Sequence, residues 1–106
     1  MRIINNRIIP FGKNFLAINL FGTIFTKGHL SPRVLNHEYI HTLQQRELLF
    51  LGFYLWYLGE WLFRLIQYRD PLQAYRNISF EREAYENDSN LDYPKLRKRY
   101  SWWKYL

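Results

Sequence analysis

The stretch that decides the fold starts the helical part of the chain and carries two histidines. It reads Ser31-Pro32-Arg33-Val34-Leu35-Asn36-His37-Glu38-Tyr39-Ile40-His41. A serine followed by proline is a typical helix start, because the serine oxygen can cap free amides and proline loses no hydrogen bond there. Residues four apart lie on one face of a helix, so both imidazoles can reach a single ion. The sequence therefore predicts a helix that presents a metal-binding histidine pair.

The available ligand types limit the kind of metal site. The chain contains no cysteine, so a metal must be held by nitrogen and oxygen atoms. Zinc accepts such ligands in tetrahedral geometry, and three protein ligands leave a position open for water. Glu38, beside the histidine face, could take the proton of that water as it attacks a carbonyl carbon. We expect zinc as the cofactor, with His37 and His41 as ligands and Glu38 as catalytic base. The alternative is a structural histidine pair with a solvated glutamate.

A catalytic zinc needs a third protein ligand, and the sequence offers few candidates. The remaining histidine, His29, lies just before the helix and would point away from its inner face, so we favour a loop role for it. A glutamate on a second helix is the better candidate. Ser79 precedes Phe80–Glu86, whose residues include strong helix formers and whose early carboxylates suit the positive end of a helix. Glu81 lies near the start of this segment.

These motifs resemble the gluzincin class of zinc peptidases. The pattern His37-Glu38-Tyr39-Ile40-His41 followed by Glu81-Arg82-Glu83-Ala84-Tyr85 is similar to families whose second helix reads Glu-x-x-Ala-Asp or Glu-x-Glu-Ala-Asp. The continuation His41-Thr42-Leu43-Gln44-Gln45 resembles small bacterial relatives in which the motif runs on as His-Thr-x-Gln-Gln. The resemblance covers residues 30–87 and implies a minimal zincin fold.

The resemblance also implies roles for residues of the second helix. It assigns the third metal ligand to Glu81, with Glu83 as the fallback because residues two apart on a helix face different sides. The aspartate that usually follows the alanine, a supporting group in the family, is Tyr85 in this chain. A tyrosine there could donate a hydrogen bond to a tetrahedral oxyanion, which makes Tyr85 a candidate catalytic residue. The alternative is a ring that packs against the first helix.

Turn signals divide the chain into an extended front and a helical remainder, with the boundary near Lys27-Gly28. Upstream, Arg7–Pro10, Asn14–Leu20 and Gly22–Thr26 are short and rich in β-branched and aromatic residues, which predicts two or three antiparallel strands. We expect an α+β fold, with a small N-terminal antiparallel sheet followed by a helical zincin-like core. One domain should cover residues 1–106, with strands in 1–28 and helices in 31–106.

The helical part is divided by its own start and stop signals. Apolar density stays high to Tyr68, and we expect Gly52 or Gly59 to break this stretch into two helices. Asp70-Pro71 predicts the start of a short helix, and Tyr93-Pro94 the start of a last one reaching Trp103.

The most apolar stretch of the chain is too short to cross a membrane. Leu48–Gly59 carries no charge but is followed by Glu60 and Arg64, whereas a spanning helix needs about 20 mostly apolar residues. We interpret it as a buried or interfacial helix whose leftover rings form a dimer or lipid-facing patch.

The formal net charge of +6 is concentrated late in the chain. Basic residues alternate there with aromatic ones, a pattern that suits nucleic-acid phosphates and bases, an anionic membrane surface, or a solvated helix with its rings on the core. The basic residues are Lys95, Arg97, Lys98, Arg99 and Lys104, among Tyr93, Tyr100, Trp102, Trp103 and Tyr105.

Three functions are consistent with these patterns. The first is a zinc-dependent metallopeptidase acting on a peptide or protein substrate. The second is a catalytically inactive, peptidase-like binding or regulatory module. The third is binding to a membrane surface or, less favoured, to nucleic acid through the basic aromatic C-terminus. Residues 1–10 lack the apolar run of a secretory signal, so we expect a cytoplasmic protein. Membrane association and homo-oligomer formation stay open.

Overall fold

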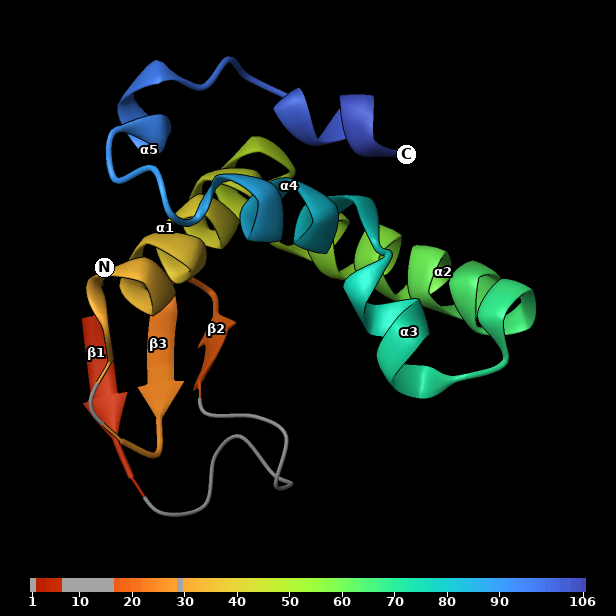
Figure 1. The fold of residues 1–106 in the computed structure, drawn as a ribbon, viewed down its shortest axis with the longest axis horizontal. Coiled ribbons are helices and arrows are strands. Elements are labelled where there is room, and N and C mark those ends of the chain that lie inside the picture. The colour runs from red at the N-terminus through yellow and green to blue at the C-terminus, as the bar shows by residue number, and fades with distance from the viewer. Residues whose placement is uncertain (1, 7–16, 29) are drawn as a thin grey trace.

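The fold places a small sheet against one helix of a larger helical part, as the ribbon in Figure 1 shows. It is a computed structural model that describes residues 2–6, 17–28 and 30–106. The strands are β1 (Arg2–Asn5), β2 (Ala17–Leu20) and β3 (Thr23–Thr26), and all helices follow them. The α+β class predicted from the sequence is therefore confirmed. The expected strand at residues 7–10, the start of the one at residues 14–20, and His29 lie outside the described residues.

The sheet is mixed, so the expectation of an antiparallel sheet is only partly correct. Its strand order is β1-β3-β2, with β3 antiparallel to β2 and parallel to β1. β2 and β3 are joined by the two-residue turn Phe21-Gly22, with φ of 52° and 81°, which forces an antiparallel hairpin. β1 reaches the other edge of β3 through a long connection, which allows parallel pairing. The sequence patterns had not indicated a strand at β1.

Helix α1 (Pro32–Glu47) begins where the sequence predicted. Ser31 caps it, and its Oγ accepts a hydrogen bond from the Val34 amide at 3.2 Å. The helix ends in a turn in which the amide of Phe50 donates to the carbonyl of Gln45 at 2.7 Å and that of Leu49 to the carbonyl of Arg46 at 3.3 Å. This pair of bonds is the usual helix-ending motif, here built without glycine.

The break between the first two helices lies at residues 48–50, so the expectation of a break at Gly52 or Gly59 is wrong. Both glycines lie within α2 (Leu51–Tyr68). Leu49 and Phe50 instead adopt positive φ angles of 54° and 61°, and α1 and α2 are bent by 110°. The hydrogen bonds that end α1 hold these two residues in a conformation that glycine would adopt more easily.

Two shorter helices come directly after α2. Asp70 caps α3 (Pro71–Arg76) by accepting a bond from the Leu72 amide at 3.0 Å. Ser79 is the first residue of α4 (Ser79–Asn87), and the Glu60 carboxylate of α2 accepts bonds from its amide and, at 2.6 Å, its hydroxyl. A carboxylate suits this position because the N-terminus of a helix carries partial positive charge.

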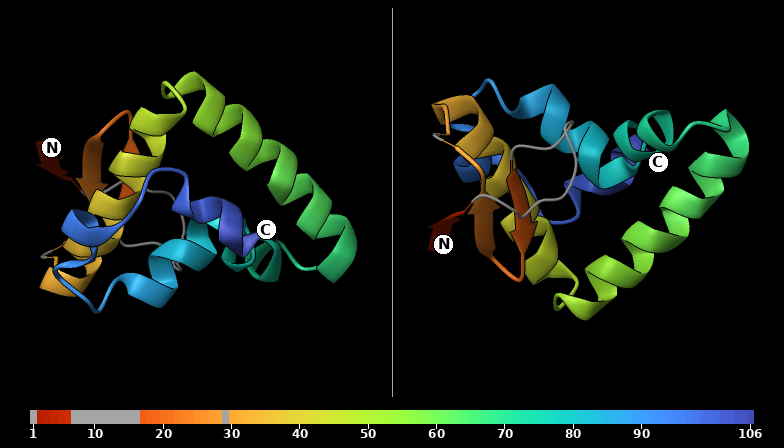
Figure 2. Two further views of the ribbon diagram at one scale, coloured as in Figure 1. Left: turned by 90° about the horizontal axis from the view of Figure 1, so that it is seen from above. Right: turned by 90° about the horizontal axis from the view of Figure 1, so that it is seen from below.

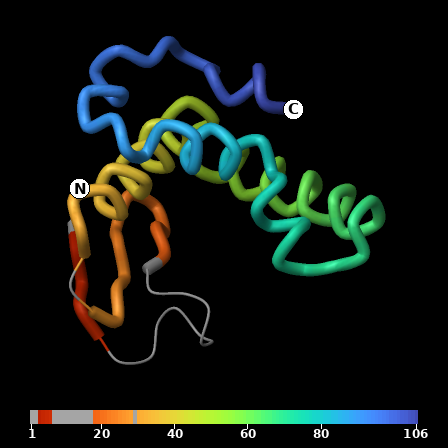
Figure 3. Tube along the Cα trace, in the orientation of Figure 1, coloured from red at the N-terminus to blue at the C-terminus, as the bar shows by residue number. Residues whose placement is uncertain are grey.

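The expected continuous last helix is wrong. It consists of α5 (Tyr93–Leu96) and a separate 3-10 helix η1 (Ser101–Tyr105). Between them, Arg97 is extended, with φ of −69° and ψ of 144°, and Tyr100 has φ of 59°. The tube in Figure 3 shows this C-terminal segment returning along α4, where η1 contacts that helix.

The apolar core lies where α2, α4 and η1 meet. Phe53, Ile78, Phe80 and Trp102 form a buried cluster, and the Phe53 and Phe80 ring centroids are 4.5 Å apart. The core therefore holds α2 against α4, the helix that carries the predicted third ligand.

Among the described residues, no single helix is long and apolar enough to cross a membrane. The bent pair of α1 and α2 reaches such a length and composition when the two are taken together.

Candidate metal centre

Helix α1 is buried mainly through polar side chains. A buried polar group is costly unless it has a hydrogen-bond partner, so these residues require a network around them. Only Ile40 is an apolar member of the buried set of this helix. The polar members, each at most 8% exposed, are Asn36, His37, Glu38, His41, Thr42, Gln44 and Gln45.

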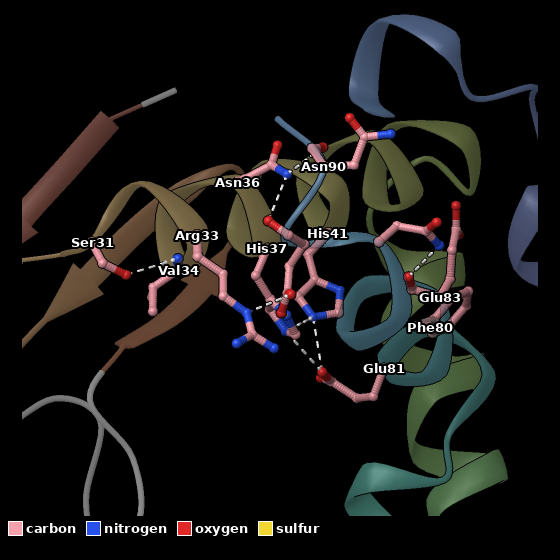
Figure 4. A network of polar contacts seen from close by, with 12 residues as sticks. Ser31, Arg33, Val34, Asn36, His37, His41, Phe80, Glu81, Glu83 and Asn90 are labelled. Atoms are coloured by element: carbon pink, nitrogen blue, oxygen red, sulfur yellow. Dashed lines mark hydrogen bonds and ion pairs between the residues drawn. The ribbon is translucent and has the colours of Figure 1, made fainter. Parts of the chain in front are cut away.

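Two of these residues converge with Glu81 of α4, as Figure 4 shows. Glu81 Oε1 lies 3.2 Å from His37 Nε2 and 3.0 Å from His41 Nε2, and the two Nε2 atoms are 3.1 Å apart. Tetrahedral ligands about 2.0–2.1 Å from one zinc ion are separated by about 3.3 Å. The three atoms therefore fit a common ion after an expansion of a few tenths of an ångström, and the buried group could hold a metal.

Each histidine is oriented by a partner on its other ring nitrogen. His37 Nδ1 donates to Asp88 Oδ2 at 3.0 Å, and His41 Nδ1 donates to Gln44 Oε1 at 2.7 Å. Because a proton on Nδ1 leaves the lone pair on Nε2, these bonds favour the tautomer that binds a metal through Nε2. Asp88 is itself held by Arg33 Nε at 2.7 Å.

The third candidate ligand is also supported from behind. Glu81 is 3% exposed, and its second oxygen, Oε2, accepts a hydrogen bond from the Tyr57 hydroxyl at 2.7 Å. Tyr57 lies on α2, where burial raises the pKa of its hydroxyl well above the usual range. It therefore stays a neutral donor, and Glu81 Oε1 is left facing the histidines.

The charges at the site depend strongly on one another. Burial disfavours a charged His41 ring, but the Glu81 carboxylate outweighs this and raises the pKa of His41 to about 9. Burial alone would raise the pKa of Glu81, yet the two histidines hold it well below its usual range. Burial raises the pKa of Glu38 to about 6, although His41 and His37 oppose the shift. Without a metal, a proton on His41 neutralises the Glu81 carboxylate.

Glu83, the fallback ligand, lies outside this group. It is fully buried, and its carboxylate accepts bonds from Arg97 Nε at 2.8 Å, the Tyr93 hydroxyl at 2.6 Å and Gln44 Nε2 at 2.9 Å. Glu81 and Glu83 face different neighbours because residues two apart on a helix point to different sides. Glu83 joins the C-terminal segment to α1 and α4.

Tyr85 packs beside the site. Its ring lies edge-on to the His37 ring with centroids 4.5 Å apart, and the Arg76 guanidinium lies 4.5 Å from the Tyr85 ring centroid. Its hydroxyl is hydrogen-bonded to that of Tyr75, and burial raises the pKa of both groups. These contacts match the packing alternative, and the catalytic role of Tyr85 stays a prediction.

The sheet is tied to α1 next to the histidines. Asn19 of β2 donates to the Glu38 carbonyl at 2.7 Å and to the Thr42 hydroxyl at 2.6 Å. Gln45 donates to the Asn19 carbonyl at 3.2 Å and accepts from the Gly22 amide at 3.0 Å. Thr42, Gln44 and Gln45, the polar residues that continue the histidine motif, thus each have a structural partner.

Sequence reasoning did not identify the supporting residues Asp88, Tyr57 and Gln44. A signal existed for Asp88, which lies seven residues after Glu81 and hence on the same face of α4 and its last turn. No local signal marks Tyr57, because its position depends on how α2 packs. Comparisons with protein-family models, with curated proteins and with solved structures found no match to this chain.

Proposed function

We propose that this protein is a zinc-dependent metallopeptidase, in which an activated water attacks a peptide carbonyl. The observation that carries the proposal is the convergence of His37 Nε2, His41 Nε2 and Glu81 Oε1 within 3.2 Å of one another. Two nitrogens and one carboxylate oxygen, with a fourth position free, are the ligand set of catalytic zinc.

The three ligand atoms suit zinc, and the residues that hold these ligands in place suit catalysis. When bound, zinc would supply Lewis acidity, which lowers the pKa of water and polarises a carbonyl. The protein contributes orientation: Asp88 and Gln44 hold the two rings, and Tyr57 holds Glu81. Such supporting groups are typical of metal centres whose ligands must not move during reaction.

Glu38 is the group that would accept the proton of the attacking water. It follows His37 directly in α1 and is 7% exposed, and the charges of both histidines and of Glu81 affect its pKa. Burial raises its pKa to about 6, and a base works best when its pKa lies near the operating pH. In this role Glu38 would later return the proton to the leaving amine.

The test measures metal content and hydrolysis on the same protein samples. We expect about one zinc per chain by elemental analysis of protein purified without chelator. Glu81→Gln should lose the zinc, whereas Glu86→Gln, an exposed glutamate of the same helix, should keep it. Glu38→Gln should keep the zinc but abolish cleavage of a mixed peptide library read by mass spectrometry.

Each outcome bears on a separate part of the proposal. Absence of zinc in the wild type, even after zinc is added back, would remove the metal centre. Zinc that survives Glu81→Gln would remove Glu81 as a ligand. Zinc binding without cleavage of any peptide in the wild type would leave the inactive binding module as the function.

A further inference from the structure

Helix α2 turns its charged residues inward and its leucines outward. Its two charged side chains, Glu60 and Arg64, are each 8% exposed. A helix that faces water carries the opposite pattern, because buried charges need partners and charged groups are best solvated outside. The outward residues recur every three or four positions and are 48–78% exposed: Leu51, Leu55, Leu58, Leu62 and Ile66. We call these five residues the α2 stripe.

The inward charges are explained by the fold itself. Glu60 caps α4 through Ser79, and Arg64 Nε lies 3.7 Å from Glu60 Oε2 while its Nη1 donates to Gln67 at 2.9 Å. The α2 stripe has no such explanation within the described part of the chain. It runs along a helix about 27 Å long that forms one edge of the molecule in both views of Figure 2.

Aromatic side chains widen the stripe on one side. Trp56 and Phe63 of α2 are 40% and 60% exposed. Trp103 of η1 is 59% exposed, and its ring centroid lies 6.1 Å from that of Trp56. Leu55, Trp56, Phe63 and Leu106 line an open hollow of about 650 Å³ between α2 and the C-terminus, together with Gly59 and the charged Glu60 and Arg64. The apolar surface therefore extends from the α2 stripe onto the C-terminal segment.

Basic residues frame this apolar surface. Arg46 and Arg99 line a second hollow together with Leu49, at the end where α1 meets α2. Arg69 lies at the opposite end of α2, and Lys104 follows Trp103. All four basic side chains are exposed.

The acidic residues at the two ends of α2 already have partners. Glu47 accepts bonds from Arg97 at 3.2 Å and from the Tyr100 amide at 2.6 Å, and Asp70 accepts from the Leu72 amide. The four exposed basic residues outnumber these two carboxylates, so the charge around the α2 stripe is positive on balance, in line with the formal net charge of +6.

We propose that the α2 stripe, with Trp56, Phe63 and Trp103, binds the surface of an anionic lipid bilayer, with α2 lying in the interface plane. An apolar helix face bordered by tryptophan and arginine or lysine is the pattern of interfacial helices. A second copy of this chain suits the surface less well, because pairing would bring two positively charged rims together.

The orientation has a consequence for the metal centre. Tyr57 and Phe53 extend from the opposite side of α2, where Tyr57 binds Glu81 and the Phe53 ring lies 6.4 Å from that of His41. The centre would therefore lie about one helix diameter, roughly 10 Å, from the bilayer surface.

The test is flotation of the 106-residue chain with vesicles of phosphatidylcholine, alone or in an equal mixture with phosphatidylglycerol. We expect binding to the mixed vesicles that weakens as salt is added, and little binding to phosphatidylcholine alone. Leu58→Gln and Leu62→Gln should each weaken that binding about tenfold, since a leucine no longer enters the bilayer. Leu91→Gln is the matched control, because Leu91 is exposed but lies outside the proposed lipid-binding surface, and this variant should bind like the wild type.

Several results would overturn the proposal. The first is that the wild type does not bind the mixed vesicles. The second is that Leu91→Gln weakens binding as much as Leu58→Gln does. The third is that the wild type does not bind vesicles but forms a dimer without lipid, and that Leu58→Gln dissociates this dimer. Glutamine is a good helix former, and circular dichroism of each variant verifies that the helix content of the chain is kept. The inference does not rest on the proposed function: His41→Ala should bind vesicles like the wild type, whatever its metal content.

Discussion

At the residue scale, the centre depends on side chains that hold other side chains. In both His37 and His41, Nδ1 is hydrogen-bonded to a supporting side chain, and Nε2 faces the shared candidate metal site. The resemblance to gluzincins implies a supporting aspartate at position 85, where this chain has tyrosine. Here Asp88 is the aspartate that supports His37. The support comes from one helical turn further along the chain.

Replacing Asp88 tests this support. Asp88→Asn should weaken zinc binding about 10- to 100-fold, because the neutral amide holds His37 Nδ1 less firmly and makes the ring a poorer ligand. Zinc affinity is measured by competition with a chromogenic chelator. Asp92→Asn, an exposed aspartate in the following turn, is the control and should leave zinc affinity unchanged. Equal affinity in Asp88→Asn and the wild type would contradict the role of Asp88.

At the element scale, a buried cation helps to hold the C-terminal segment against the helices. Arg97 extends between α5 and η1, and its guanidinium binds Glu83 of α4 and Glu47 of α1. The two carboxylates outweigh the effect of burial and raise the pKa of Arg97 above its usual range. One of the basic residues of the C-terminus is thus a structural link, and the others remain on the surface.

Removal of this link should destabilise the whole chain. Arg97→Ala should lower the free energy of unfolding by about 3–5 kcal/mol, because Glu83 would stay buried without its cation. The free energy is measured by urea denaturation followed by circular dichroism. Lys98→Ala removes an exposed neighbouring charge and should change it by less than about 0.5 kcal/mol. Similar losses in both variants would show that Arg97 contributes only its charge.

At the scale of the whole molecule, the centre joins two helices that are distant in sequence. His37 and Glu81 are 44 positions apart, and the contact between α1 and α4 is made largely of polar groups. A metal that binds this site only in the folded chain stabilises the folded state by mass action.

Zinc should therefore raise the melting temperature. At a free concentration of about 100 times the dissociation constant, the gain is about 2.7 kcal/mol, which corresponds to a shift of roughly 10 °C for a chain of this length. Thermal unfolding with and without zinc measures it. His41→Ala should remove the shift, and a shift of equal size in that variant would mean that zinc binds elsewhere.

The features readable from the sequence are those that depend on near neighbours. Ser31-Pro32 starts α1 and Asp70 starts α3, because a cap acts within three residues. His37 and His41 share a face because a helix repeats every 3.6 residues. The α+β class followed from the change of pattern near residue 28.

Tertiary structure alone decided the rest, because it depends on contacts between distant segments. The parallel pairing of β1 with β3, for example, brings together Arg2 and Thr23, which are 21 positions apart. Tyr57 comes to Glu81 only because the apolar core fixes α2 against α4. The sequence by itself therefore determined the candidate ligand pair and its helix, whereas packing decided which side chains surround it.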